Sequence, residues 1–221
     1  MLSAILFDLD GTLANTDPLH FKVWQEILAQ YSIKCDRQFY QEHISGNTNE
    51  RLIANVLPHL SPEEAKQLAW DKEAQYRAKA TTLEPTPGLD RVLKLIEQIP
   101  LKKAAVTNAP KENAFHMLEA LNLTETFPIL VLAADAPPGK PDPAPYLLGL
   151  EKLGVVASDA IAFEDSPTGI KSAVAAGIYT FGVASTHEPK LLKEFGANMV
   201  IDDFNSQELW QFFTKALSSK L

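Results

Sequence analysis

Two aspartates separated by one residue follow an apolar run near the start of the chain. Residues 4–7 are apolar, and the letters DLDGT, with Asp8 and Asp10, come directly after them. The run is typical of a buried strand, so both carboxylates are expected in the loop at its carboxyl end. There, one carboxylate ionised by a metal can attack phosphorus, and the other can hold the proton for the leaving group. A strand end followed by a solvated acidic turn is the alternative.

Two further motifs carry groups that bind anions. Thr107 ends the strand-like run at 103–107 and Asn108 follows it, whereas Lys140 stands between a glycine and a proline in the letters GKPDP. A hydroxyl and a side-chain amide can hold phosphoryl oxygens. The lysine, on a restricted backbone, suits pairing with both a nucleophilic carboxylate and a phosphate. Taken singly, the first motif also fits a helix-capping turn, and the second fits a surface lysine.

An acidic pair forms the fourth motif. Glu164 and Asp165 directly follow the apolar run at 160–163. Mg²⁺ prefers hard oxygen ligands, typically one or two carboxylates together with waters and phosphate oxygens. Asp8, the main-chain carbonyl of Asp10 and Asp165 can supply the protein's share of such a site. Since the letters SP come next and suit a helix start, an acidic helix cap is the alternative.

The elements that must position these groups alternate between strand and helix patterns. This alternation predicts an α/β fold, a Rossmann-like parallel sheet with helices on both faces. Ligands in such sheets bind at the carboxyl ends of the strands. All four motifs stand at a strand end or in the loop after one, so we expect them to converge on one edge of the sheet. The strand-like runs lie at residues 4–7, 103–107, 129–132, 160–163, 180–183 and 199–201.

A helical block interrupts this rhythm directly after the first strand. Phe21 to Tyr31 is amphipathic, and Ser61 begins a helix with proline at the first position and glutamate at the third. The following segment at 84–88 has the composition of a hinge. We therefore expect a core domain of residues 1–15 and 84–221, with an all-helical domain of residues 16–83 inserted into it.

Bulk composition narrows the classes of function. The 221 residues suffice for a core domain and a smaller second one. A net charge of −8 disfavours general nucleic-acid binding, which needs a basic surface. No run approaches the roughly 20 apolar residues of a membrane span, and the start lacks the basic region of a signal peptide. The single cysteine, Cys35, implies no disulfide framework. A cytoplasmic protein with neither nucleic-acid nor membrane partners is expected.

In their order and separations, DLDGT, VTN, GKPDP and FEDS resemble the four motifs of the haloacid dehalogenase superfamily. The position of the helical insert resembles the branch with a helical cap after the first motif, which includes β-phosphoglucomutase and many sugar phosphatases. The resemblance covers essentially the whole chain. It implies a monomeric, Mg²⁺-dependent phosphomonoester hydrolase that acts on a small phosphorylated metabolite through an aspartyl-phosphate.

The resemblance also implies catalytic roles. Asp8 would attack the phosphoryl group, and Asp10 would protonate the leaving alcohol and then activate water. Thr107 and Asn108 would bind the phosphoryl group. Lys140 would steady Asp8 and neutralise charge on the transferred group.

The implied metal site adds the acidic pair to the first motif. Asp8, Asp10 and Asp165 would bind Mg²⁺, with Glu164 either a direct ligand or a partner through water.

In the helical domain, the resemblance points to His20 and to the loop at 45–50 as substrate contacts, through Gly46, Asn47 and Asn49. His20 is equally consistent with an ordinary helix-face residue. Mutase-like members carry an arginine in this loop that grips a second phosphate, whereas Asn49 stands near that place here. The departure favours a phosphatase over a phosphosugar mutase.

Three alternatives differ in chemistry. A phosphosugar mutase would return the phosphoryl group to a substrate rather than to water. A dehalogenase is disfavoured because Asp10 and Asp165 suit metal-assisted phosphoryl transfer. Receiver-like signalling modules also place an aspartate, a Thr or Ser and a lysine at strand ends, but they are smaller and lack the helical insert. Sugar phosphates, phosphoglycolate and nucleoside monophosphates all remain open as substrates.

Overall fold

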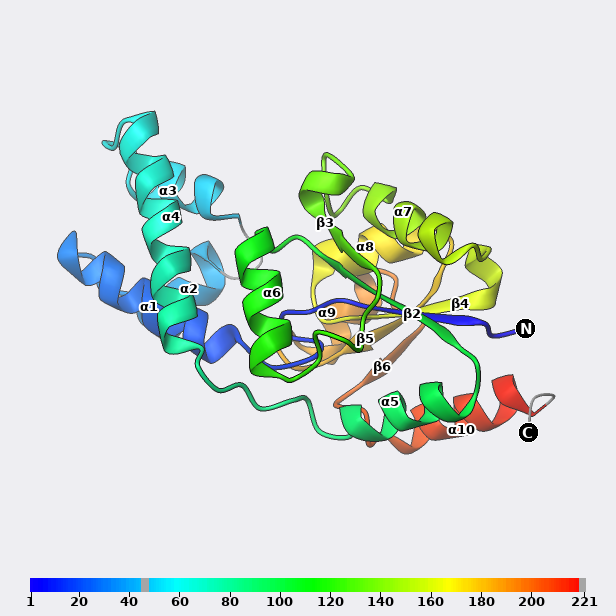
Figure 1. Ribbon diagram of the computed structural model, residues 1–221. Helices are drawn as coiled ribbons and strands as arrows, with labels where there is room; N and C mark the ends of the chain where they lie inside the picture. Colours follow the sequence, from blue (N-terminus) through cyan, green and yellow to red (C-terminus); the bar gives the residue numbers. More distant parts are fainter. Residues whose placement is uncertain (45–47, 219–221) are drawn as a thin grey trace. The chain divides into compact units, whose positions relative to one another are not determined.

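The computed structural model describes residues 1–44 and 48–218 (Figure 1). Gly46 and Asn47, two of the expected substrate contacts, lie outside the described residues. The chain divides into a core unit of Met1–Asn15 and Leu83–Leu221 and a helical unit of Thr16–Thr82. Leu83, expected in the helical domain, belongs to the core unit.

The core unit is built on a six-stranded parallel sheet in the order β3-β2-β1-β4-β5-β6. This confirms the α/β fold predicted from the alternating pattern. Because the strands are parallel, the loops that follow them emerge along the same edge. The strands are β1 (Ala4–Phe7), β2 (Lys102–Thr107), β3 (Leu130–Leu132), β4 (Ala160–Glu164), β5 (Tyr179–Val183) and β6 (Met199–Ile201).

Helices cover both faces of the sheet (Figure 1). Alternate residues of the central strands contribute to two separate apolar layers: Phe7 and Phe163 belong to one and Leu6 and Ala162 to the other. The rings of Phe7 and Phe163 stack with centroids 5.3 Å apart. The runs are apolar at every position because both faces are buried. The α-helices of the core are α5 (Leu89–Gln98), α6 (Lys111–Ala120), α7 (Ala144–Leu153), α8 (Pro167–Ala175), α9 (Pro189–Glu194) and α10 (Gln207–Leu217), with short 3₁₀ turns at η1 (Ala133–Asp135) and η2 (Ala157–Asp159).

The helical unit is all-α in its described residues, with α4 packed against α1 and α3. The predicted start of α4 has both bonds of a capping box. The Ser61 hydroxyl accepts from the Glu64 amide at 3.3 Å, and the Glu64 carboxylate accepts from the Ser61 amide at 2.8 Å. The helices are α1 (Asp17–Gln30), α2 (Arg37–His43), α3 (Asn49–Val56) and α4 (Pro62–Lys79).

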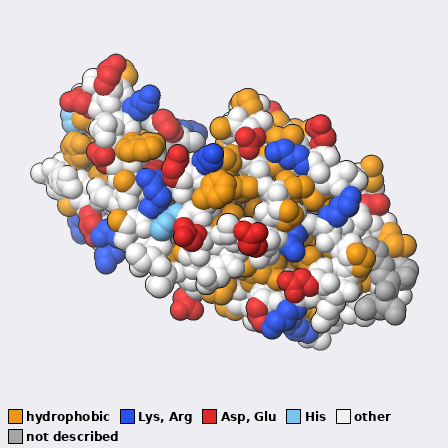
Figure 2. All heavy atoms as spheres, in the orientation of Figure 1, with side chains coloured by type: hydrophobic (Ala, Val, Ile, Leu, Met, Phe, Trp, Pro, Cys, Tyr) orange, Lys and Arg blue, Asp and Glu red, His pale blue; other side chains and the backbone are white. Residues whose placement is uncertain are grey.

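The described helices and the charges on the surface bear on the expectations about membranes and nucleic acids. Within the described residues, none of the helices is long and apolar enough to cross a membrane. On the face shown in Figure 2, Lys and Arg side chains are interspersed with Asp and Glu side chains. This face is therefore mixed in charge rather than basic.

Candidate active site

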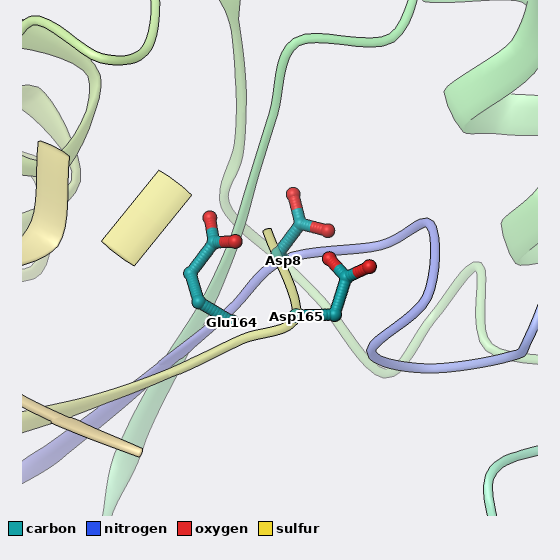
Figure 3. Close-up of side chains that lie close together, drawn as sticks. All are labelled: Asp8, Glu164 and Asp165. Carbon is teal, nitrogen blue, oxygen red and sulfur yellow. The ribbon is translucent and has the colours of Figure 1, made fainter. Parts of the chain in front are cut away.

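Three buried carboxylates meet where β1 and β4 end. Asp8 follows β1, Glu164 is the last residue of β4, and Asp165 comes next. The Asp8 amide donates to the Phe163 carbonyl at 3.0 Å, which joins the two strand ends. One oxygen from each of the three carboxylates lies within 4.8 Å of the other two, and Asp8 stands between Glu164 and Asp165 (Figure 3). The structure therefore brings together the first and fourth motifs.

Lys140 supplies the positive charge of this cluster. Its ammonium group donates to Asp8 Oδ1 at 2.5 Å, to Glu164 Oε1 at 2.6 Å and to the Val106 carbonyl at 2.7 Å. The side chain is only 3% exposed. An ammonium group has three hydrogens, so these contacts use all of them and fix its position.

Burial and neighbouring charges shift the pKa values of the ionisable groups in this cluster. Burial lowers the pKa of Lys140, but the adjacent Asp8 and Glu164 carboxylates outweigh it and raise that pKa overall. Burial raises the pKa of Asp8, an effect that Lys140 only partly offsets. The pKa of Asp165 is also raised, first by burial and then by its acidic neighbours. The cluster therefore holds more negative charge than a single lysine compensates.

Glu164 makes hydrogen bonds beyond the metal binding that the sequence predicts for it. Its Oε1 accepts from the Tyr146 hydroxyl at 2.8 Å as well as from Lys140. A Cβ on Gly169 would lie 1.9 Å from Glu164 Oε2, so only glycine lets the carboxylate sit against the first turn of α8. The positive end of that helix favours a buried carboxylate here. Glu164 thus holds Lys140 in place, whether or not it also reaches a metal.

Asn108 holds the main chain of Lys140 from both sides. Its Nδ2 donates to the Lys140 carbonyl at 3.0 Å, and its Oδ1 accepts from the Lys140 amide at 2.9 Å. Gly139, at φ +81°, permits the approach, since a Cβ there would lie 3.1 Å from Asn108 Oδ1. Asn108 therefore joins the second and third motifs, and its phosphate-binding role stays a prediction.

Thr107 is buried at the end of β2, and its hydroxyl accepts from the Ala109 amide at 2.9 Å. A hydroxyl that accepts a bond keeps its hydrogen for donation. The geometry is compatible with the predicted donation to a phosphoryl oxygen.

Asp10 lies in a tight turn that begins after Asp8. The turn is closed by the Gly11 amide, which donates to the Ala14 carbonyl at 2.8 Å. Gly11 has φ +76°, and a Cβ there would lie 2.0 Å from Asp165 Oδ2. Asp10 is half-buried whereas Asp8 is buried. Two carboxylates in such different surroundings can take different roles in proton transfer and nucleophilic attack.

The residues present fit a hard divalent cation. All candidate donors are oxygens, and the pKa values of Asp8 and Asp165 are raised, above all by burial and also by their acidic neighbours. A doubly charged cation would supply the missing compensation, and hard cations prefer such ligands.

Cation affinity is expected to rise with pH. Protons and the cation compete for the same carboxylates, and the raised pKa values of Asp8 and Asp165 keep protons on them at higher pH than usual. Binding therefore releases protons. For each proton released, affinity should gain up to about tenfold per pH unit until the pH exceeds the raised pKa values. Calorimetric titration of the protein with Mg²⁺ at several pH values measures this, and a pH-independent affinity would contradict it.

In the helical unit, His20 and Asn49 meet in one polar cluster. Lys72 Nζ lies 2.9 Å from His20 Nδ1 and donates to Glu73 Oε1 at 2.8 Å. Asn49 Nδ2 donates to the same Glu73 oxygen at 2.5 Å. The His20 ring stacks on Tyr76 with centroids 4.2 Å apart. We call these five residues the cap cluster; its α4 members were not anticipated from the sequence.

The charges of the cap cluster balance each other. Lys72 and Glu73 are both buried. Burial raises the pKa of Glu73, but the Lys72 ammonium and the hydrogen bonds from Lys72 and Asn49 outweigh it and leave that pKa below its ordinary value. Glu73 is therefore a carboxylate at neutral pH. It lies next to Asn49, which stands near the position where mutase-like members carry an arginine.

The family model for haloacid dehalogenase-like hydrolases matches residues 5–183. The chain belongs to this family. The hydrolase is 30% identical to a phosphorylated carbohydrates phosphatase from Thermotoga maritima over 200 residues, covering 89% of this chain and 92% of that protein. It is 29% identical to β-phosphoglucomutase from Bacillus subtilis over 209 residues, covering 90% and 89%. A family IA variant 3 hydrolase from Entamoeba histolytica superposes with a TM-score of 0.86 at 30% identity, covering 97% and 100%.

Proposed function

We propose that this haloacid dehalogenase-like hydrolase is a Mg²⁺-dependent phosphomonoester hydrolase that acts on a small sugar phosphate through an aspartyl-phosphate on Asp8. The observation that carries the proposal is the buried contact of Lys140 with Asp8, beside Glu164 and Asp165. A carboxylate held by an ammonium group at the carboxyl-terminal edge of a parallel sheet suits in-line attack on phosphorus. The phosphatase from Thermotoga maritima supports the choice of substrate class.

In the proposed reaction, an Asp8 oxygen attacks phosphorus and the bond to the substrate oxygen breaks. Asp10 gives its proton to the leaving alcohol. Asp10 then takes a proton from water, whose oxygen attacks phosphorus and releases inorganic phosphate and free Asp8. Lys140 orients Asp8, and Thr107 donates to a phosphoryl oxygen.

When bound, Mg²⁺ supplies charge compensation for the phosphoryl group and the carboxylates around it. Asp8, the main-chain carbonyl of Asp10 and Asp165 would hold it, with Glu164 a ligand directly or through water.

A phosphosugar mutase is the second candidate, favoured by the similarity to β-phosphoglucomutase. The cap cluster argues against it. Asn49, near the place where mutase-like members carry an arginine, is neutral and donates to Glu73, so it offers no positive charge to a second phosphate. We propose that His20 and Asn49, with Glu73, contact hydroxyl groups of the substrate instead.

Release of inorganic phosphate from a panel of esters separates these functions. The panel contains hexose phosphates, glycerol phosphate, phosphoglycolate and a nucleoside monophosphate, each assayed with Mg²⁺ and with EDTA. Mg²⁺-dependent release, highest on a sugar phosphate, is expected. Isomer formation without phosphate release would establish the mutase instead, and halide release from 2-haloacids without Mg²⁺ would establish a dehalogenase.

The monomeric and cytoplasmic state expected from the sequence stays a prediction. Light scattering on the purified protein tests the oligomeric state.

A further inference from the structure

The loop after β5, at residues 184–188, contacts both acidic loops of the site. The Ser185 hydroxyl donates to the Gly11 carbonyl, and the Thr186 hydroxyl donates to Asp165 Oδ2. Asn15 Nδ2 donates to the Ser185 carbonyl at 3.3 Å. One short segment therefore ties the loop that carries Asp8 and Asp10 to the residue that follows β4.

Thr186 is itself held by a neighbour. His187 Nδ1 lies 2.8 Å from the Thr186 hydroxyl oxygen. A hydroxyl has one hydrogen, and that of Thr186 goes to Asp165 Oδ2. The contact with His187 must then be donated by the ring through its Nδ1 hydrogen. In this arrangement the His187 ring fills the acceptor position of the Thr186 hydroxyl, whose hydrogen is left for Asp165.

Asp165 is confined on its other side by the main chain. Its Oδ2 would lie 2.0 Å from a Cβ on Gly11, so this oxygen is packed between the Gly11 backbone and the Thr186 hydroxyl. With one end of the carboxylate fixed in this way, the group has a single orientation beside Asp8. Carboxylates that bind metals are commonly oriented by such hydrogen bonds.

We infer that Thr186, oriented by His187, is a positioning residue that holds Asp165 in the geometry for binding a divalent cation. The inference rests on the cation site of the proposed function. It adds the loop at 184–188 as a fifth segment of a site that the four motifs had defined.

Direct titration of the protein with Mg²⁺ tests the inference without relying on turnover. Thr186→Val keeps the shape of the side chain and removes the hydroxyl. It should weaken Mg²⁺ affinity by about 10- to 100-fold, as loss of a partner to a metal ligand typically does. Thr186→Ser, which restores the hydroxyl, should recover most of the affinity.

The assay of turnover should divide in the same way. In Thr186→Val, the Mg²⁺ concentration at half-maximal rate rises, while the rate at saturating Mg²⁺ stays close to that of the wild type. A loss of general structural integrity would instead lower the saturated rate and the melting temperature without metal. Thr214→Val is the matched control, because Thr214 also donates a side-chain hydrogen bond, to Trp210 on α10, and its loss should leave Mg²⁺ affinity unchanged.

Two outcomes would overturn the inference and are distinguishable from each other. If the wild type binds Mg²⁺ and folded Thr186→Val binds it equally well, the positioning role is wrong and the proposed cation site stands. If the wild type binds no divalent cation, the cation site itself fails. Should Thr186→Val unfold, His187→Phe carries the test, because it removes the ring donor and should weaken Mg²⁺ affinity in the same direction by a smaller factor; an unchanged affinity contradicts the inference.

Discussion

Replacing Asp8 by asparagine is expected to lower phosphate release by about four orders of magnitude or more, because the amide cannot form the acyl-phosphate bond. The fold should persist. Asparagine keeps the shape of the side chain and an oxygen that can accept from Lys140 Nζ, now 2.5 Å from Asp8 Oδ1. Burial raises the pKa of Asp8 in the metal-free site, so a neutral side chain is tolerated there. Initial rates on the preferred ester, together with the melting temperature, measure both effects.

Asp90→Asn is the matched control for this variant. Asp90 also accepts from a lysine, Lys94 at 3.2 Å, but both side chains are about 70% exposed and stand on α5. Its turnover should equal that of the wild type. If Asp8→Asn kept a tenth of the wild-type rate, another group would have to be the nucleophile.

Lys140→Met should lose both stability and turnover. The change leaves Asp8 and Glu164 buried without the ammonium group that now lies 2.5 and 2.6 Å from them. Removing one partner of a buried ion pair costs about 3–5 kcal/mol of the free energy of unfolding. Turnover should fall by about 100-fold or more, since Asp8 also loses the charged donor that orients it for attack. Urea unfolding and initial rates give the two values.

The stability loss of Lys140→Met should shrink as the pH falls. Without Lys140, the pKa of Asp8 rises further, because burial remains and the opposing ammonium group is gone. The pKa of Asp8 is about 8 even with Lys140 present, so in the variant protonation neutralises the carboxylate, and removes part of the cost, as the pH falls from alkaline values toward 8. Lys94→Met breaks the exposed pair with Asp90. It should change the free energy of unfolding by less than about 1 kcal/mol at every pH tested. Equal stability of Lys140→Met and the wild type would contradict the proposed compensation.

The core of the candidate site could be predicted because its residues follow buried strands of a parallel sheet. Each of the apolar runs that stop directly before Asp8 and Glu164 predicts both a strand and the place where that strand ends. Parallel pairing then brings these ends to one edge without any knowledge of side-chain contacts. The strand register, with Phe7 opposite Phe163, agrees with that expectation.

The partners of individual groups could not be predicted in the same way. Asn108 has the chemistry of a phosphate ligand, but its amide is used to hold Lys140, which stands 32 residues away. Thr186 and His187 stand in an ordinary polar loop, and only the neighbouring position of β4 and β5 brings Thr186 to Asp165.

The helical unit shows a different limit. Lys72 and Glu73 are adjacent charged residues on a polar helix, a pattern typical of an exposed face, yet both are buried. The spacing of Lys72 and Tyr76 by four residues was the available signal, since it places them on one face of α4. Pro18 was a signal for the start of α1, because proline suits the first turn of a helix and α1 begins at Asp17.

Trapping the covalent intermediate tests directly whether Asp8 is the nucleophile. The protein is mixed with Mg²⁺ and its preferred ester, quenched in acid within a turnover, and reduced with borohydride, which converts an aspartyl-phosphate to homoserine. Peptide mass spectrometry then locates the change. We expect homoserine at position 8 in the wild type and none when Mg²⁺ or the ester is omitted. Phosphate release with an unmodified Asp8, or with homoserine at another aspartate, would contradict it.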